Sequence, residues 1–228
     1  EKANDNQDIN LEYNFNNLGL ANFKKGNFSN AKKFFKRAIQ IKNNFAQAHC
    51  NFANLSLLSK DFKIGWEEYE WRLDPKMRSR LHDSFINLKE NRWHREESLD
   101  NRTILVRSEQ GLGDTIQFCK YVKLLKSNTT KVVLEVQDCL VDLIKSLDNE
   151  IDVVKRSSNF TSFDFQVPLL SLPFEFETKE ENFPSNISYL SVNEERTKYW
   201  KSKIDDRNFN IGIAWQGSTG LIDQGRSF

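Results

Sequence analysis

The spacing of apolar residues changes near Thr103, and this change divides the 228-residue chain into two kinds of structure. Over roughly the first 75 residues, apolar positions recur at intervals of three and four, which is typical of amphipathic helices. From Thr103 onward, short apolar runs alternate with stretches of helical spacing, which indicates a parallel sheet with helices on both faces. The sequence therefore predicts a helical N-terminal part followed by an α/β part.

The helical part contains an internal repeat with a period of about 34 residues. Five small or apolar positions have counterparts one period later: Leu18, Gly19, Ala31, Phe35 and Ala38 correspond to Phe52, Ala53, Gly65, Tyr69 and Arg72. This period predicts helix-turn-helix units of the tetratricopeptide kind, although a plain helical hairpin gives a similar pattern. The second unit departs from the first where Arg72 replaces a small residue and Trp66, Tyr69 and Trp71 cluster. Terminal repeats deviate where they dock onto other structure, so we expect this end to contact the next domain.

Four regions follow from these patterns: helical repeats over 1–73, a linker over 74–102, a Rossmann-like domain over 103–208 and the start of a second such domain over 209–228. The linker is made basic by Arg78, Arg80, Arg92 and Arg95, and we expect it to be solvated and pinned to a domain by Trp93. The expected strands are 104–107, 132–136, 151–154, 163–167 and 187–190, with a buried strand beginning at Asn210. The expected helices are 115–126, 139–147 and 194–204.

Composition excludes several classes of function. Lys+Arg 33 against Asp+Glu 32 leaves a formal net charge of +1, so no overall field favours nucleic acid. The odd number of cysteines predicts reduced core residues at Cys50, Cys119 and Cys139. No apolar run is long enough for a membrane span, no signal peptide is visible, and the three histidines lack the spacing of a metal site. These features predict a cytoplasmic protein without a metal, and both ends of the chain suggest a piece of a longer protein.

The loop after the first expected strand contains the candidate site residues. It reads Glu109-Gln110-Gly111-Leu112-Gly113-Asp114 and precedes a helical pattern. A dinucleotide loop is disfavoured because Ile116 stands where the third glycine belongs and Asp114 would face the pyrophosphate. Two interpretations of Asp114 stay open on spacing alone. It is either a helix N-cap, or a general base that takes a proton from an incoming hydroxyl and is kept ionised by the helix N-terminus.

Several motifs, in order along the chain, resemble one family. They are the WEEYEWR stretch at 66–72, EQGLGDTIQFCKY at 109–121, VLEVQ at 133–137, FDFQVPLLSLP at 163–173 and GIAWQG at 212–217. The chain resembles, from about Leu11 to Phe228, the bacterial tetratricopeptide proteins with a C-terminal glycosyltransferase domain similar to heptosyltransferases. These are glycosyltransferase family 9-like proteins with a GT-B fold.

The resemblance implies roles for individual residues. Asp114 would be the catalytic base, with Glu109, Gln110, Gly111, Gly113 and Gln117 binding substrate around it. The donor phosphates would be held by Gln216, Gly217, Ser218 and Arg226. Many members carry a His and an Asp-Arg pair in this second loop, where this chain reads GLIDQGR at 220–226.

The resemblance also implies an inverting transfer from a nucleotide-sugar co-substrate to a glycan or protein acceptor, with no further cofactor and no metal. The helical repeats would bind a protein partner or the acceptor in their groove. The piece in hand, lacking most of the donor domain, is expected to be inactive by itself. The alternative is a protein-interaction scaffold whose glycosyltransferase-like domain is degenerate.

Overall fold

The computed structural model describes residues 10–80, 91–126, 130–158, 160–184, 188–204 and 207–213. The chain forms two compact units, Glu1–Leu190 and Ser191–Phe228. The first unit holds both the helical part and the sheet, so their mutual contacts can be described directly. The domain boundaries expected from the sequence stay predictions.

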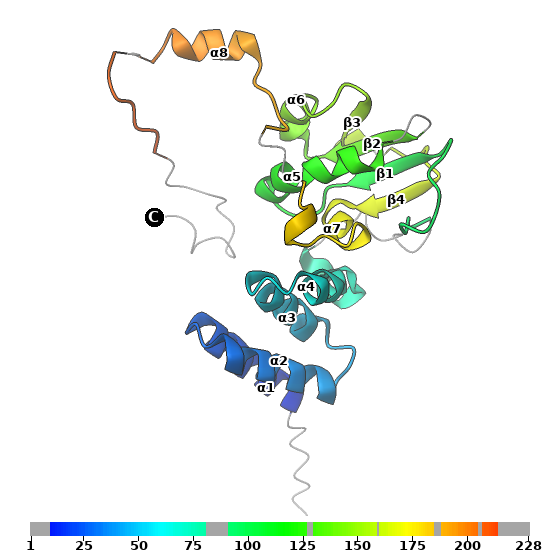
Figure 1. The fold of residues 1–228 in the computed structure, drawn as a ribbon, viewed down its shortest axis with the longest axis vertical. Coiled ribbons are helices and arrows are strands. Elements are labelled where there is room, and N and C mark those ends of the chain that lie inside the picture. The colour runs from blue at the N-terminus through cyan, green and yellow to red at the C-terminus, as the bar shows by residue number, and fades with distance from the viewer. Residues whose placement is uncertain are drawn as a thin grey trace, which may run out of the picture. The chain divides into compact units, whose positions relative to one another are not determined.

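The helical part is a series of four α-helices joined by short turns (Figure 1). These helices are α1 (Leu11–Lys24), α2 (Phe28–Ile41), α3 (Ala46–Leu58) and α4 (Phe62–Tyr69). Each helix packs against the next one along the chain. The turn between α1 and α2 contains Gly26 at a φ of 77°, which glycine adopts without strain. Gly26 and Asn27 thus separate α1 from α2.

Small residues allow these helices to approach closely. A Cβ atom added to Gly19 would lie 2.5 Å from the ring of Phe35, and one added to Gly65 would lie 2.6 Å from Leu57. Ala53, the repeat counterpart of Gly19, and Ala31, the counterpart of Gly65, are fully buried. The repeat pattern thus marks the helix crossings, while the assignment to the tetratricopeptide class stays a prediction.

Two 3₁₀ helices, η1 (Glu70–Leu73) and η2 (Pro75–Arg80), continue from α4, and the α/β part then begins. Its described strands form one parallel four-stranded sheet in the order β3-β2-β1-β4. The strands are β1 (Thr103–Arg107), β2 (Lys131–Val136), β3 (Ile151–Lys155) and β4 (Phe165–Pro168). A helical part followed by a Rossmann-like α/β part is therefore what the structure shows.

Helical segments follow the strands. After β1 come α5 (Leu112–Phe118) and the 3₁₀ helix η4 (Cys119–Leu125); after β2 come η5 (Asp138–Leu140) and α6 (Val141–Ile144). The 3₁₀ turn η6 (Arg156–Ser158) follows β3, while η7 (Leu169–Ser171), α7 (Leu172–Glu175) and η8 (Glu180–Asn182) follow β4. The helix expected over 115–126 thus begins three residues earlier and tightens into a 3₁₀ helix after Phe118.

The main core lies on one face of the sheet. Ile104, Val106, Leu134 and Val167 share a cluster with apolar residues of η4, α6, η7 and α7. Leu105 and Val133, which alternate with these residues and point to the other face, are also buried but stand outside that cluster. The described helical segments named above contribute to this face, and the expectation of helices on the opposite face stays a prediction.

The linker is not simply solvated. The backbone of Arg92 forms a parallel bridge with Gln166 along the outer edge of β4, and Trp93 is 4% exposed within the main core. Trp93 N donates to Gln166 O at 2.9 Å, and Trp93 Nε1 donates to Glu97 O at 3.0 Å. The prediction that Trp93 anchors the linker is confirmed. The expected solvated linker is wrong for Arg92, which pairs with Glu70.

Three further sequence predictions are corrected. Residues 188–190, the described part of the expected strand 187–190, are not a strand; the outer edge of β4 is instead occupied by Arg92. Residues 210–213 are exposed and form no strand, with Ile211 and Ile213 each 73% exposed. Cys139 is exposed, whereas Cys50 and Cys119 are buried as expected. In the second unit, the helix expected over 194–204 is present as α8 (Glu194–Lys201), with Asn193 as a side-chain N-cap.

Candidate active site

The sheet order places a topological switch point between β1 and β4. The chain leaves β1 toward β2 and β3 on one side and returns to β4 on the other. In open α/β sheets, ligands bind outside the carboxyl ends of the strands at such a point. The loop 108–111 follows β1 and η7 follows β4, so the predicted loop lies at the carboxyl ends of the strands, at the switch point.

An ion pair joins the helical part to this loop. Arg72 Nε donates to Glu109 Oε2 at 3.0 Å, and Arg72 Nη2 donates to Glu109 Oε1 at 2.7 Å. The backbone N–H of Leu170 donates to the same Oε1 at 3.0 Å. Both side chains are almost completely buried. The structure therefore gives Glu109, a predicted substrate-binding residue, a position in the docking contact, because its carboxylate is already occupied by protein donors.

A second carboxylate completes this contact. Arg72 Nη1 donates to Glu70 Oε1 at 2.6 Å, and Arg92 pairs with the other oxygen of Glu70. Ser171 Oγ, which accepts from Arg72, donates to Glu70 at 2.9 Å. Burial would raise the pKa of Glu70, but the guanidinium groups of Arg72 and Arg92 outweigh it and hold the pKa below its ordinary value. We call Glu70, Arg72, Arg92, Glu109 and Ser171 the docking cluster.

Gln110 connects the helical part to the exposed half of the loop. Its Nε2 donates to the Tyr69 hydroxyl oxygen at 2.7 Å, and its backbone carbonyl oxygen accepts from Gln137 Nε2 at 3.0 Å. Burial is the main cause that raises the pKa of Tyr69, and the negative charges of Glu109 and Asp114 act in the same direction. Tyr69 thus lies at the edge of the candidate site. The sequence predicts only a docking role for Tyr69, and its clustering with Trp66 and Trp71 is the sequence feature that points to this residue.

Asp114 lies in the first turn of α5 and is half-buried. The N-cap residue is Gly111, and the backbone N–H of Gly111 donates to Asp114 Oδ2 at 2.9 Å. The N-cap interpretation of Asp114 is therefore wrong in position, since Asp114 is the third residue of the helix and reaches back to the cap. This bond fixes the carboxylate by one oxygen.

The side of the loop beyond Asp114 is open. Gly111, Gly113 and Gln117 are exposed. A Cβ atom added to Gly113 would have no atom within 4 Å, and Gly111 has an ordinary extended backbone with φ of −74° and ψ of 171°. The glycines are therefore not required by backbone strain. They leave space beside Asp114 into which a ligand can come close.

The predicted donor-phosphate residues Gln216, Gly217, Ser218 and Arg226 lie outside the described residues. Across the described ranges, no group of three or more His, Cys, Asp or Glu side chains could hold a metal ion. In the same part of the chain, no helix combines the length and the hydrophobicity needed to cross a bilayer.

No model of a known protein family matches the chain, and no curated protein matches it either. The geometry of the loop and its neighbours therefore carries the functional argument.

Proposed function

We propose that the chain belongs to a glycosyltransferase that moves a sugar from a nucleotide-sugar donor to a hydroxyl of a glycan or protein acceptor. The proposal rests on the difference in burial and hydrogen bonding between the two acids of the loop. Glu109 is buried and bound by Arg72, whereas Asp114 is partly exposed beside the open space at Gly113. Asp114 is thus the loop carboxylate that an incoming hydroxyl can reach.

In the proposed reaction, the acceptor hydroxyl gives its proton to Asp114 as its oxygen attacks the anomeric carbon of the donor. The bond from that carbon to the nucleoside diphosphate breaks, and the diphosphate leaves with the electron pair. The Gly111 N–H holds Oδ2, so Oδ1 is the oxygen that can accept the proton. Gln110, Gly111, Gly113 and Gln117 would surround the acceptor, and the donor would be bound by the second domain through Gln216, Gly217, Ser218 and Arg226.

The test compares the wild-type protein, in its full natural length, with Asp114→Asn in donor hydrolysis and sugar transfer. A positioned base contributes about 10²–10⁴-fold, so we expect a loss of that size in the rate with little change in donor affinity. Asp138→Asn is the matched control, because Asp138 is an exposed acid that follows β2 and bonds Ser157. Equal rates for Asp114→Asn and wild type would remove Asp114 from the mechanism.

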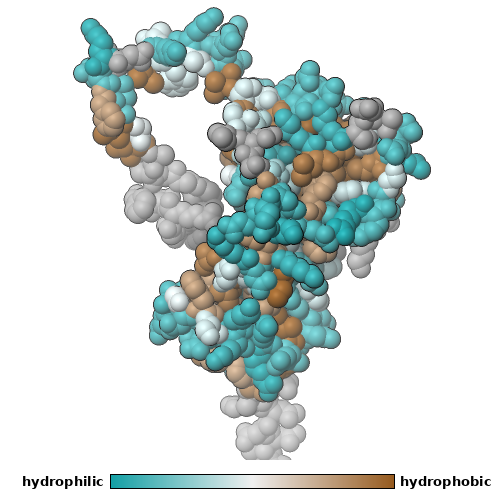
Figure 2. All heavy atoms as spheres, viewed as in Figure 1, coloured by the Kyte–Doolittle hydropathy of each residue, from teal (hydrophilic) through white to brown (hydrophobic). Residues whose placement is uncertain are grey.

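A protein-interaction scaffold is the second candidate. It is favoured by Leu11, Tyr13 and Leu18 of α1, which are 46%, 48% and 47% exposed. In the view of Figure 2, hydrophilic residues cover much of the helical part and hydrophobic patches lie between them. Calorimetry with a panel of nucleotide sugars separates the two candidates. Absence of binding to every donor, together with tight binding of a protein or peptide, would favour the scaffold.

A further inference from the structure

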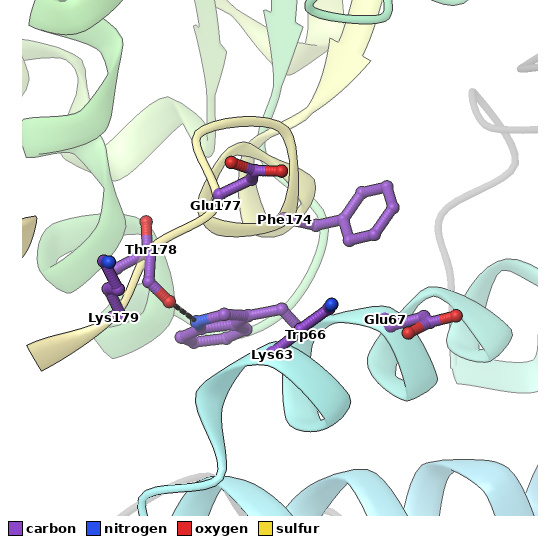
Figure 3. Close-up of a pocket in the computed structure, with 7 residues that line it drawn as sticks. All are labelled: Lys63, Trp66, Glu67, Phe174, Glu177, Thr178 and Lys179. Atoms are coloured by element: carbon purple, nitrogen blue, oxygen red, sulfur yellow. Dashed lines mark hydrogen bonds between the residues drawn. The ribbon is translucent and has the colours of Figure 1, made fainter.

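A cavity of about 310 Å³ lies between α4 of the helical part and α7 with the segment that follows it. Figure 3 shows its lining, which combines one partly exposed ring, one buried indole and several charged side chains. The lining residues are Lys63, Trp66, Glu67, Phe174, Glu177, Thr178 and Lys179. The volume is at the lower end of the range of small-ligand sites. None of these residues belongs to the loop that carries Asp114.

The wall of the cavity is fixed by the contact between the two parts of the unit. Trp66 Nε1 donates to the carbonyl of Thr178 at 3.0 Å, across 112 residues of sequence. The other side of the indole meets the ring of Phe118 edge-on, with centroids 6.2 Å apart. Trp66 and Thr178 are both buried, so neither can turn away. The cavity is therefore preformed.

The charged groups at the cavity are of both signs. Glu177 is paired with Arg95 at 2.8 Å, and this hydrogen bond is the main cause that lowers the pKa of Glu177. The charges of Lys63 and Lys179 lower the pKa of Glu177 further, and within the described residues neither lysine nor Glu67 forms a direct ion pair. The cavity therefore offers two ammonium donors and one carboxylate acceptor next to an aromatic surface. Its charges nearly balance, so it has no strong excess to hold a simple anion.

We propose that this cavity binds a neutral saccharide unit. A sugar ring has an apolar face of C–H groups and a rim of hydroxyls that both donate and accept hydrogen bonds. The ring of Phe174 can pack against the apolar face of the sugar. Hydrogen bonds to its hydroxyls can come from Lys63, Lys179 and Glu67. Rings of this kind bury apolar area at low entropy cost, and charged partners strengthen hydrogen bonds to hydroxyls. The binding itself does not depend on transferase activity; if the proposed function holds, the cavity would hold a sugar of the acceptor glycan away from the reacting hydroxyl.

Saturation-transfer NMR on the whole chain tests the proposal with named probes: maltose, lactose and the disaccharide of N-acetylglucosamine, with inorganic phosphate as competitor. We expect at least one disaccharide to bind and phosphate not to displace it. Phe174→Ala should weaken binding about tenfold, and Glu67→Gln about threefold or more. Tyr199→Ala, an exposed aromatic of α8 in the other unit, is the matched control and should bind as wild type.

Glu67 is an exposed surface residue, so Glu67→Gln keeps the test meaningful if Phe174→Ala fails to fold. Absence of binding by all three sugars, unchanged binding in both cavity variants, or displacement by phosphate would overturn the proposal. Asp114→Asn should retain saccharide binding. A protein that binds sugar but shows no Asp114-dependent transfer would refute the proposed function alone, and one that transfers sugar without binding at this cavity would refute this inference alone.

Discussion

The two acids of the loop after β1, Glu109 and Asp114, are five residues apart and have opposite surroundings. Glu109 is 3% exposed and accepts three hydrogen bonds from Arg72 and Leu170. Asp114 is partly exposed, and among the described residues its carboxylate accepts one bond, from the N–H of the N-cap residue Gly111. The first holds two parts of the protein together, and the second has an oxygen available to a ligand. One short motif therefore contains both a structural contact and a candidate chemical group.

The largest expected effect is on the buried acid. Arg72→Ala leaves the Glu109 carboxylate buried without its counter-charge, and breaking a buried pair in this way costs about 3–5 kcal/mol of unfolding free energy. Urea unfolding followed by fluorescence measures the loss. Lys60→Ala is the matched control: it removes an exposed pair with Glu180, whose side chains are 67% and 62% exposed, and should cost about 1 kcal/mol or less.

The double variant Arg72→Met with Glu109→Leu separates charge from packing. Because both charges are removed, most of the stability lost in Arg72→Ala should return. A double variant as unstable as the single one would show that the two side chains matter for their shape rather than for their charges.

Helix packing gives the next largest effect. Gly65→Ala places a methyl group against Leu57, with the Leu57 backbone nitrogen 3.1 Å away, so the neighbours have little room to move. After the gain in helix propensity is subtracted, we expect a net loss of about 1–2 kcal/mol. Thermal unfolding checks this value. An unchanged melting temperature would mean that α3 and α4 can separate freely.

Acid should weaken the docking cluster. Glu70 has a lowered pKa in the folded protein, so its contribution is fully present above the ordinary value of about 4.5 and is lost as the pH falls through the lower folded value. Stability measured between neutral pH and strong acid should decline in that window. Glu70→Gln should flatten the decline. An identical slope in both proteins would assign the acid sensitivity to other carboxylates.

The smallest effect on stability is expected at the open side of the loop. Gly113→Ala meets no atom, and replacing a glycine in the first turn of α5 should stabilise the protein by about 0.5 kcal/mol. If a ligand approaches Asp114 closely, the same methyl group should lower the transfer rate. If Gly113→Ala is at least as stable as wild type and its transfer rate is unchanged, the ligand does not bind next to Gly113.

Much of the architecture could be predicted from local pattern. The strands β1, β2 and β3 and the crossings at Gly19 and Gly65 all follow from hydrophobic spacing and residue size. The strand expected over 187–190 is absent from its described residues, 188–190. Spacing also does not show that one sheet edge is already taken, because the backbone of Arg92 pairs with Gln166 beside β4.

The candidate site was only half predictable. The loop and its acids were visible as a motif, but the role of Glu109 depends on Arg72, which is 37 residues away in the sequence. The repeat pattern marked Arg72 as a departure from a small residue and indicated docking, without naming the partner. Tyr69 was missed as a neighbour of Asp114 for the same reason, since its hydrogen bond to Gln110 spans 41 residues.

The docking cluster also sets an order of assembly. The surface that receives Arg72 is made of Glu109, which follows β1, and of Leu170 and Ser171, which follow β4. A nascent chain that has not yet reached Ser171 therefore has helices without a complete docking surface. Because proteins emerge from the ribosome N-terminus first, Arg72 is synthesised before the surface that receives it is complete.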